Sequence, residues 1–171
     1  MTPFEQAKLS AMLQLQQRAG IGQYKEYSLH AVFKHLMQPD GSFHEQKIAG
    51  YVADAVDGDR IIEIQTGNFY GMSKKLSVFL REHPVTVVYP LIEHKRIVWV
   101  DPESGETAKP KLSPKKGRFT DALPELCWIS DIIRDHGNFE LWLVLVDVEE
   151  YRLTDGWGKN WFSAPPPITG G

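Results

Sequence analysis

The chain has 171 residues, enough for one domain with a sizeable core. Its net charge of −3 argues against bulk binding of nucleic acid, so a nuclease would need a local positive surface. A single cysteine, Cys127, excludes an internal disulfide and a cysteine-based zinc site, and we expect it to be a small buried residue on a helix. There is neither a secretory signal nor an apolar run long enough for a membrane span, so we expect a cytoplasmic protein.

Two helices are predicted before residue 40. Residues 3–19 carry a modest apolar stripe, and Ser28 can cap a second helix. Apolar residues in this second helix follow the i, i+3, i+4, i+7, i+8 spacing of a core-facing surface: Leu29, Val32, Phe33, Leu36 and Met37. His30 and His35 are five residues apart and cannot chelate one metal from a straight helix, so we interpret them as surface or helix-end residues.

The stretch 51–65 predicts a β-hairpin, because an apolar run lies on each side of the Asp-Gly-Asp turn at 57–59. If the last two residues of this turn form the loop, Asp54 lies opposite Glu63. If the first two form it, Asp54 lies opposite Ile61, and Glu63 is its diagonal neighbour. Both registers place the two carboxylates on one face.

Gln65 shares this face with Asp54 and Glu63, whereas the other face is apolar and can be core: Ala53, Ala55, Ile62 and Ile64. Facing carboxylates repel each other and destabilise a strand pair. A bound divalent ion with oxygen ligands, such as Mg²⁺, would make the arrangement favourable. The alternative is a pair of acids on a solvated strand face.

An Asp, a short hairpin and then Glu-x-Gln resembles the motif of the PD-(D/E)xK nuclease superfamily, which has the restriction-endonuclease-like fold. Asp54 matches the Asp and residues 63–65 match the tripeptide, with Gln65 in place of the usual Lys. The resemblance implies that Asp54 and Glu63 hold Mg²⁺ or Mn²⁺, with the Ile64 carbonyl as a further ligand. The same stretch also resembles an uncharacterised bacterial protein family.

Other residues near the motif could complete such a site. Glu45 precedes the hairpin and would add a carboxylate, or would be an exposed acid at a strand start. Gln65 could orient a water but lacks the positive charge of the family Lys. Lys74 and Lys75 could supply that charge, because we place them in the first turn of the next helix, where the helix dipole disfavours cations.

Beyond this helix, a β-branched run at 84–90 predicts a buried strand, and the strand–helix–strand order favours a parallel crossover. A separate strand is predicted at 95–100. Between 109 and 118 lies a loop that is either a solvated connection or a phosphate-contacting arm. Its basic residues are Lys109, Lys111, Lys115, Lys116 and Arg118.

The C-terminal third predicts one helix, capped by Thr120 or Asp121 and ended by Gly137, and then an apolar core strand at 139–148. The last segment is rich in aromatic residues and proline, and its rings could stack on bases or pack onto the domain. We therefore divide the chain into one domain at 1–153 and an irregular tail at 154–171.

The predicted fold is α/β, with a mixed central sheet flanked by helices and a restriction-endonuclease-like core from about residue 27 to residue 90. The leading hypothesis is a metal-dependent endo- or exonuclease that hydrolyses phosphodiester bonds of DNA or RNA. Its catalytic candidates are Asp54, Glu63, Gln65, Lys74 and Lys75. The alternatives are an inactive nuclease-fold module that binds nucleic acid or a protein partner, and an interaction subunit of a larger defence or repair assembly.

Overall fold

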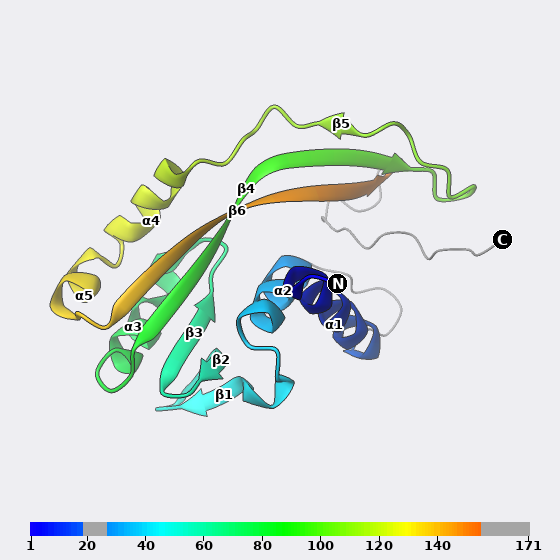
Figure 1. The fold of residues 1–171 in the computed structure, drawn as a ribbon. Coiled ribbons are helices and arrows are strands. Elements are labelled where there is room, and N and C mark those ends of the chain that lie inside the picture. The colour runs from blue at the N-terminus through cyan, green and yellow to red at the C-terminus, as the bar shows by residue number, and fades with distance from the viewer. Residues whose placement is uncertain (19–26, 155–171) are drawn as a thin grey trace.

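The computed structural model describes residues 1–18 and 27–154. Helices come first in the chain, three strands and a helix follow, and the C-terminal third ends in one long strand (Figure 1). The elements are α1 (Pro3–Arg18), α2 (Tyr27–Met37), η1 (Gly41–Phe43), β1 (His44–Ile48), β2 (Tyr51–Asp57), β3 (Arg60–Ile64), α3 (Phe69–Phe79), β4 (Val85–Val100), β5 (Lys111–Leu112), η2 (Phe119–Ala122), α4 (Leu123–Cys127), α5 (Ser130–Asp135) and β6 (Phe139–Leu153).

The six strands form one mixed sheet. Its order is β1-β2-β3-β4-β5, with β6 also paired to β4. The β1–β2, β2–β3 and β4–β5 pairs are antiparallel, whereas β3–β4 and β4–β6 are parallel. The β3–α3–β4 crossover is thus the parallel connection that the sequence predicts. The hairpin lies inside the sheet, between β1 and β4.

The turn between β2 and β3 fixes the register of the hairpin. The ladder pairs Asp57 with Arg60 and Ala55 with Ile62, so Gly58 and Asp59 form a two-residue loop. Gly58 has a φ of 62° at the first central position, where a type II′ turn favours glycine. Of the two predicted registers, the one that sets Asp54 level with Glu63 is therefore confirmed.

Helices cover both faces of the sheet (Figure 1). On one face α2 packs Phe33 against Ile62 and Ile64 of β3. On the other face α3 buries Phe69, Leu76 and other apolar side chains, and the segment containing α4 and α5 adds Ile129. The mixed sheet flanked by helices is the predicted fold class, and the predicted core-facing stripe of the second helix is confirmed.

Strand β4 is longer than predicted, because it continues through Pro90. The Val88 carbonyl accepts the Gln65 N–H, and the Ile92 carbonyl accepts the Gly117 N–H. The edge of β4 that carries these two carbonyls therefore faces the end of β3 first and then the segment after β5. Pro90 points its nitrogen to the same side, between those two contacts. Its missing N–H therefore breaks no ladder bond, and the two separate strands predicted at 84–90 and 95–100 are one.

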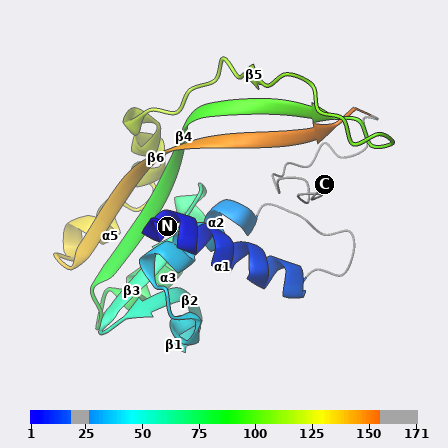
Figure 2. The same cartoon turned by 45° about the vertical axis from the view of Figure 1, so that its right-hand side comes forward.

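The second halves of β4 and β6 form a long two-stranded arm, with the β5 segment lying along β4 (Figure 2). The pairing runs from Val85 with Phe139 to Val100 with Leu153, with a register shift between Ile92 and His94. Because β6 lies at the edge, its apolar residues are only partly buried, and Trp142 is 48% exposed. The prediction of a core strand at 139–148 is therefore only half right.

Two further predictions in the C-terminal third are wrong. The expected single helix is divided into η2, α4 and α5, with Ile129 turned into the core between α4 and α5. Cys127 ends α4 and is exposed rather than buried. The predicted tail lies outside the described residues from 155 onward. Across the described part of the chain, no helix is both long and apolar enough to cross a bilayer.

Candidate functional site

Asp54 on β2 and Glu63 on β3 come together where the hairpin ladder ends. The last ladder pair is Ala55 with Ile62, and the next level holds the two acids. The Asp54 N–H lies 3.4 Å from Glu63 Oε1, within reach of a long hydrogen bond.

The sequence predicts both carboxylates on one face, and the structure brings them together at the end of the ladder but contacts them from opposite sides. Asp54 lies beside His30 of α2, whereas Glu63 lies beside Lys75 of α3, which covers the other face. Ala53, predicted to share the apolar face with Ala55, packs instead in the cluster under α3.

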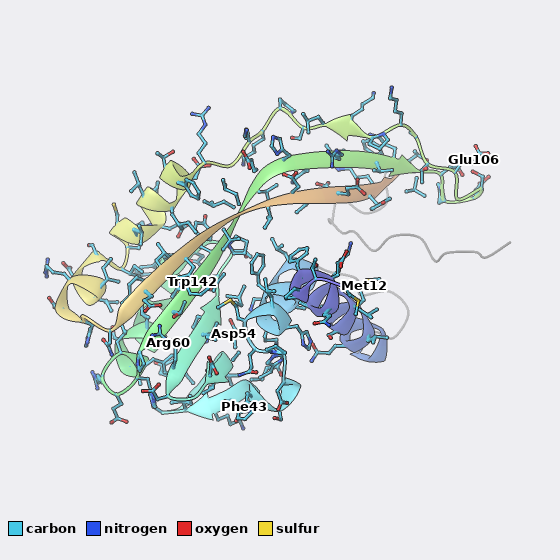
Figure 3. The ribbon with its side chains drawn as sticks, viewed as in Figure 1. Met12, Phe43, Asp54, Arg60, Glu106 and Trp142 are labelled. Atoms are coloured by element: carbon cyan, nitrogen blue, oxygen red, sulfur yellow. The ribbon has the colours of Figure 1, made fainter. Side chains whose placement is uncertain are left out.

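The Asp54 carboxylate is held from two sides. Its Oδ2 accepts the Ile64 N–H at 2.8 Å, so the side chain replaces the ladder bond that β2 no longer offers. The same oxygen lies 3.0 Å from His30 Nε2 of α2, between the sheet and that helix (Figure 3). Burial raises the pKa of Asp54, but the hydrogen bonds and positive charge around it outweigh burial and hold it below its ordinary value.

Glu63 is buried, with 4% of its surface exposed. Its Oε2 lies 2.6 Å from Lys75 Nζ of α3, which forms an ion pair with it. Burial raises the pKa of Glu63 to about 7, and the charge of Asp54 adds to this, although Lys75 acts in the opposite direction. The site therefore holds one firmly ionised carboxyl and one that titrates near neutral pH.

The position of the two lysines on α3 differs from the prediction. Because α3 begins at Phe69, Lys74 and Lys75 lie in its second turn, and the argument from the helix dipole does not apply to them. Lys75 nevertheless turns toward the sheet and reaches Glu63. Lys74 is exposed and has no ion pair among the described residues. Only one of the two predicted lysines thus joins the site.

Gln65 follows the two acids but its amide points along the chain. Its Nε2 donates to the Gly67 carbonyl and lies 3.4 Å from the Asn68 carbonyl. These bonds close the turn that leads from β3 into α3. The amide nitrogen is thus engaged within the turn, and only Oε1 is left for the water-orienting role that the sequence suggests.

Glu45 does not join the two acids. On β1 its neighbours His44 and Gln46 pair with Ala55 and Ala53 of β2, so Glu45 is level with Asp54. Its φ of 53° departs from regular strand geometry, and its carboxylate pairs with Lys34 Nζ of α2 at 2.9 Å. The expected third carboxylate is thus neutralised by a lysine of α2 and stands apart from the pair.

The basic loop at 109–118 runs along β4, away from the hairpin (Figure 1). All five of its basic residues are exposed. Lys116 pairs with Glu93 of β4 at 3.1 Å, a contact within the protein that the sequence does not predict. The other four lie on the surface.

A separate cluster lies on the arm. Glu93, His94 and Asp147 offer ligand atoms that all lie within 4.8 Å of one another. His94 Nδ1 is 2.8 Å from Asp147 Oδ1, and Lys116 already pairs with Glu93. Among the described residues this is the one group of three side chains placed to share a metal ion. Glu93 and His94 are half-buried and Asp147 is exposed, and the group is far along β4 from the two acids of the hairpin.

Sequence reasoning missed His30, which it interpreted as a surface or helix-end residue. The residue lies between Leu29 and Ala31 on the helix face that packs on the hairpin, and no local pattern distinguishes it from a solvated histidine. The one feature of the sequence that could have indicated its role is the position of His30 beside the apolar stripe of α2, since a residue there faces the element on which the helix packs.

The family described as "Domain of unknown function (DUF8091)" matches residues 27–165. The chain belongs to this family. The matched region covers α2 and every later element, and so includes the hairpin with Asp54 and Glu63.

A protein of Treponema pallidum (strain Nichols), described as an uncharacterized protein, is 30% identical to the chain over 142 residues. The match covers 82% of this chain and 56% of that protein, so the chain spans little more than half of the relative's length. No solved structure matches the chain.

Proposed function

We propose that this chain is a divalent-metal-dependent nuclease that hydrolyses phosphodiester bonds of DNA or RNA. One observation carries the proposal: Asp54 and Glu63 stand level on adjacent strands, and the Lys75 ammonium lies 2.6 Å from Glu63. Two carboxylates and a cation at one sheet end are what hydrolysis of a phosphate ester by a metal-assisted route needs. The order helix, three strands, helix and strand, from α2 to β4, also supports a restriction-endonuclease-like core.

The residues present fit a hard divalent ion. Glu63 has a pKa raised to about 7 by burial and by the charge of Asp54, which means that a second positive charge would be favourable beside it. The two carboxylates, with the Ile64 carbonyl that the resemblance adds, would give an all-oxygen donor set of the kind that Mg²⁺ and Mn²⁺ prefer. When bound, such an ion lowers the pKa of a coordinated water and neutralises phosphate charge.

The protein side chains have distinct roles in this proposal. Asp54 is kept ionised and oriented by His30 and by the Ile64 N–H, so it is ready as a ligand. Glu63 has a pKa raised to about 7 without a metal, so its binding of a cation releases a proton near neutral pH and makes metal affinity rise with pH. Lys75 supplies the positive charge that Gln65 lacks and stabilises charge developing on the phosphate.

The test is cleavage of labelled single-stranded and duplex DNA and RNA with Mg²⁺, with Mn²⁺ and with a chelator. We expect Asp54→Asn and Glu63→Gln to abolish cleavage. Lys75→Met should lower it by roughly 10²-fold, the usual effect of removing one preorganised charge. Lys74→Met is the matched control, because this neighbouring lysine is exposed and should leave the rate unchanged.

A second readout does not depend on activity. Mn²⁺ should raise the melting temperature of the wild-type protein and leave that of Glu63→Gln unchanged, because a ligand stabilises only the state that binds it. Cleavage that persists in both Asp54→Asn and Glu63→Gln would place the chemistry elsewhere and refute the proposal.

A catalytically silent binding module is the second candidate, and one observation favours it. Both carboxylates already have a nitrogen partner, since His30 lies beside Asp54 and Lys75 beside Glu63. A site neutralised by its own side chains needs no ion to be stable. This candidate predicts no melting shift with Mn²⁺ and no cleavage, but salt-dependent binding of nucleic acid.

A further inference from the structure

An open pocket lies where the start of α3 meets α4. It has a volume of about 560 Å³ and is lined by Asn68, Tyr70, Glu125 and Trp128. Two of these four residues belong to the turn and first residues of α3, directly after Gln65, and the other two belong to α4 and its C-cap. The pocket therefore opens at the carboxyl end of β3, where α/β sheets generally bind ligands.

Two large aromatic rings are left exposed in this pocket. Tyr70 is 65% exposed and Trp128 is 63% exposed. Their ring centroids lie 5.4 Å apart at an interplanar angle of 64°, so the rings meet edge to face. These two rings are not part of the core, because the residues next to them in the chain, Phe69 and Ile129, are the fully buried ones.

The polar side of the pocket is held in place by the backbone. Glu125 Oε2 accepts the Phe69 N–H at 2.8 Å, which anchors the carboxylate and leaves Oε1 toward Gly67. Asn68 accepts the Gly71 N–H with its Oδ1 at 3.2 Å, which leaves its amide N–H groups as donors. The pocket thus offers two aromatic surfaces, one fixed acceptor and one fixed donor.

We propose that this pocket binds an unpaired nucleobase of the substrate strand, an inference that rests on the proposed nuclease function. Stacking on tyrosine and tryptophan suits a flat heteroaromatic ring, and it tolerates any base. The Glu125 carboxylate favours adenine, cytosine and guanine over thymine and uracil, because only the first three carry an exocyclic amino group that can donate to it. The base would belong to a nucleotide near the cleaved bond, since Glu63 and Asn68 are joined by one short segment of chain.

The test measures binding of fluorescein-labelled single-stranded DNA and RNA, and of a duplex, in the presence of a chelator so that no cleavage occurs. We expect Trp128→Ala and Tyr70→Ala each to weaken single-strand binding by roughly tenfold or more, the usual loss when a stacking ring is removed. Trp128→Phe should restore most of it. Trp142→Ala is the matched control, because Trp142 is a half-exposed tryptophan on β6, outside the pocket.

Two further arms make the result specific. Glu125→Gln should reduce the preference for adenine, cytosine and guanine over thymine or uracil, and AMP alone should bind far more weakly than the strand. Equal binding by wild type, Trp128→Ala and Tyr70→Ala would overturn the inference, as would AMP that binds as tightly as the strand, since the pocket would then serve a free nucleotide.

This experiment also separates the inference from the function on which it rests. Loss of binding in the aromatic variants, with no cleavage under any condition, supports the pocket and refutes the nuclease. Metal-dependent cleavage with unchanged KM in Trp128→Ala and Tyr70→Ala supports the nuclease and refutes the pocket.

Discussion

Substitution of Glu63 by glutamine should stabilise the metal-free protein, and more so as the pH rises. An unfolded glutamate has a pKa of 4.5, whereas burial and the charge of Asp54 raise that of Glu63 to about 7. The folded state therefore holds a proton that the unfolded state has released, and stability falls as the pH rises from 4.5 to 7. At 1.36 kcal/mol per unit, the full penalty above pH 7 is about 3 kcal/mol. Glutamine has no such penalty.

The assay is urea unfolding of wild type and Glu63→Gln at pH 5 and pH 8 with a chelator present. We expect the gain from the substitution to be larger at pH 8 by about 2 kcal/mol, since at pH 5 most of the penalty has not yet appeared. Packing and hydrogen-bond effects of the substitution are common to both pH values and cancel in the difference. Asp59→Asn, in the exposed turn of the same hairpin, is the control and should show no such change.

A gain that is the same at both pH values would refute this reasoning. It would mean that the ion pair with Lys75 compensates Glu63 fully, and that the two acids are not in conflict without a metal. Added Mg²⁺ sharpens the measurement, because a cation between the carboxylates should stabilise the wild type at pH 8 and leave Glu63→Gln unaffected.

Two further predictions concern residues that hold the site and the sheet. His30→Ala removes the imidazole beside Asp54 Oδ2, so the pKa of Asp54 should rise in a carboxyl NMR titration, while His83→Ala, which loses only a bond to a backbone carbonyl, should leave it in place. Gly117→Ala should cost about 2 kcal/mol in urea unfolding, because its Cβ would lie 2.6 Å from the Ile92 carbonyl oxygen, whereas Gly137→Ala meets nothing within 4 Å and should be close to neutral. A neutral Gly117→Ala would show that the segment after β5 does not pack on β4 as described.

Much of the hairpin could be predicted from the sequence because its determinants are local. The Asp-Gly-Asp turn restricts the loop to two registers, and one of them is confirmed. The alternation of side chains also predicts Asp54 and Glu63 on one face, but this alternation ends at Ala55, and Asp54 lies beside α2 whereas Glu63 lies beside α3. The parallel crossover from β3 to β4 follows from the order of elements. In these cases a residue's neighbours along the chain decide its environment.

The missed features depend on contacts between distant segments. By local rules Pro90 marks the end of a strand, yet β4 continues through it. The pairing of β4 with β3 ends before Pro90, and the contact of β4 with Gly117 comes after it, so no neighbouring strand needs an N–H at Pro90. His30 reads as a surface residue until α2 packs on the hairpin. Cys127 and Trp142 belong to apolar stretches, and their exposure follows from the break before α5 and from the edge position of β6.

In the resemblance to the nuclease motif, Gln65 stands where the tripeptide usually has a lysine. A lysine acts through the position of its ammonium group, and its long flexible stem lets that group arrive from another element. Since α3 follows β3 and returns over the same face, Lys75 reaches Glu63 from a place that no tripeptide motif includes. Gln65 meanwhile closes the turn that sets where α3 begins, and thereby where Lys75 lies. A lysine at position 65 would place a second cation beside Glu63 and would remove the amide that donates to the Gly67 carbonyl. Positions 65 and 75 are therefore coupled, and Gln65 contributes to the geometry of the site through this turn.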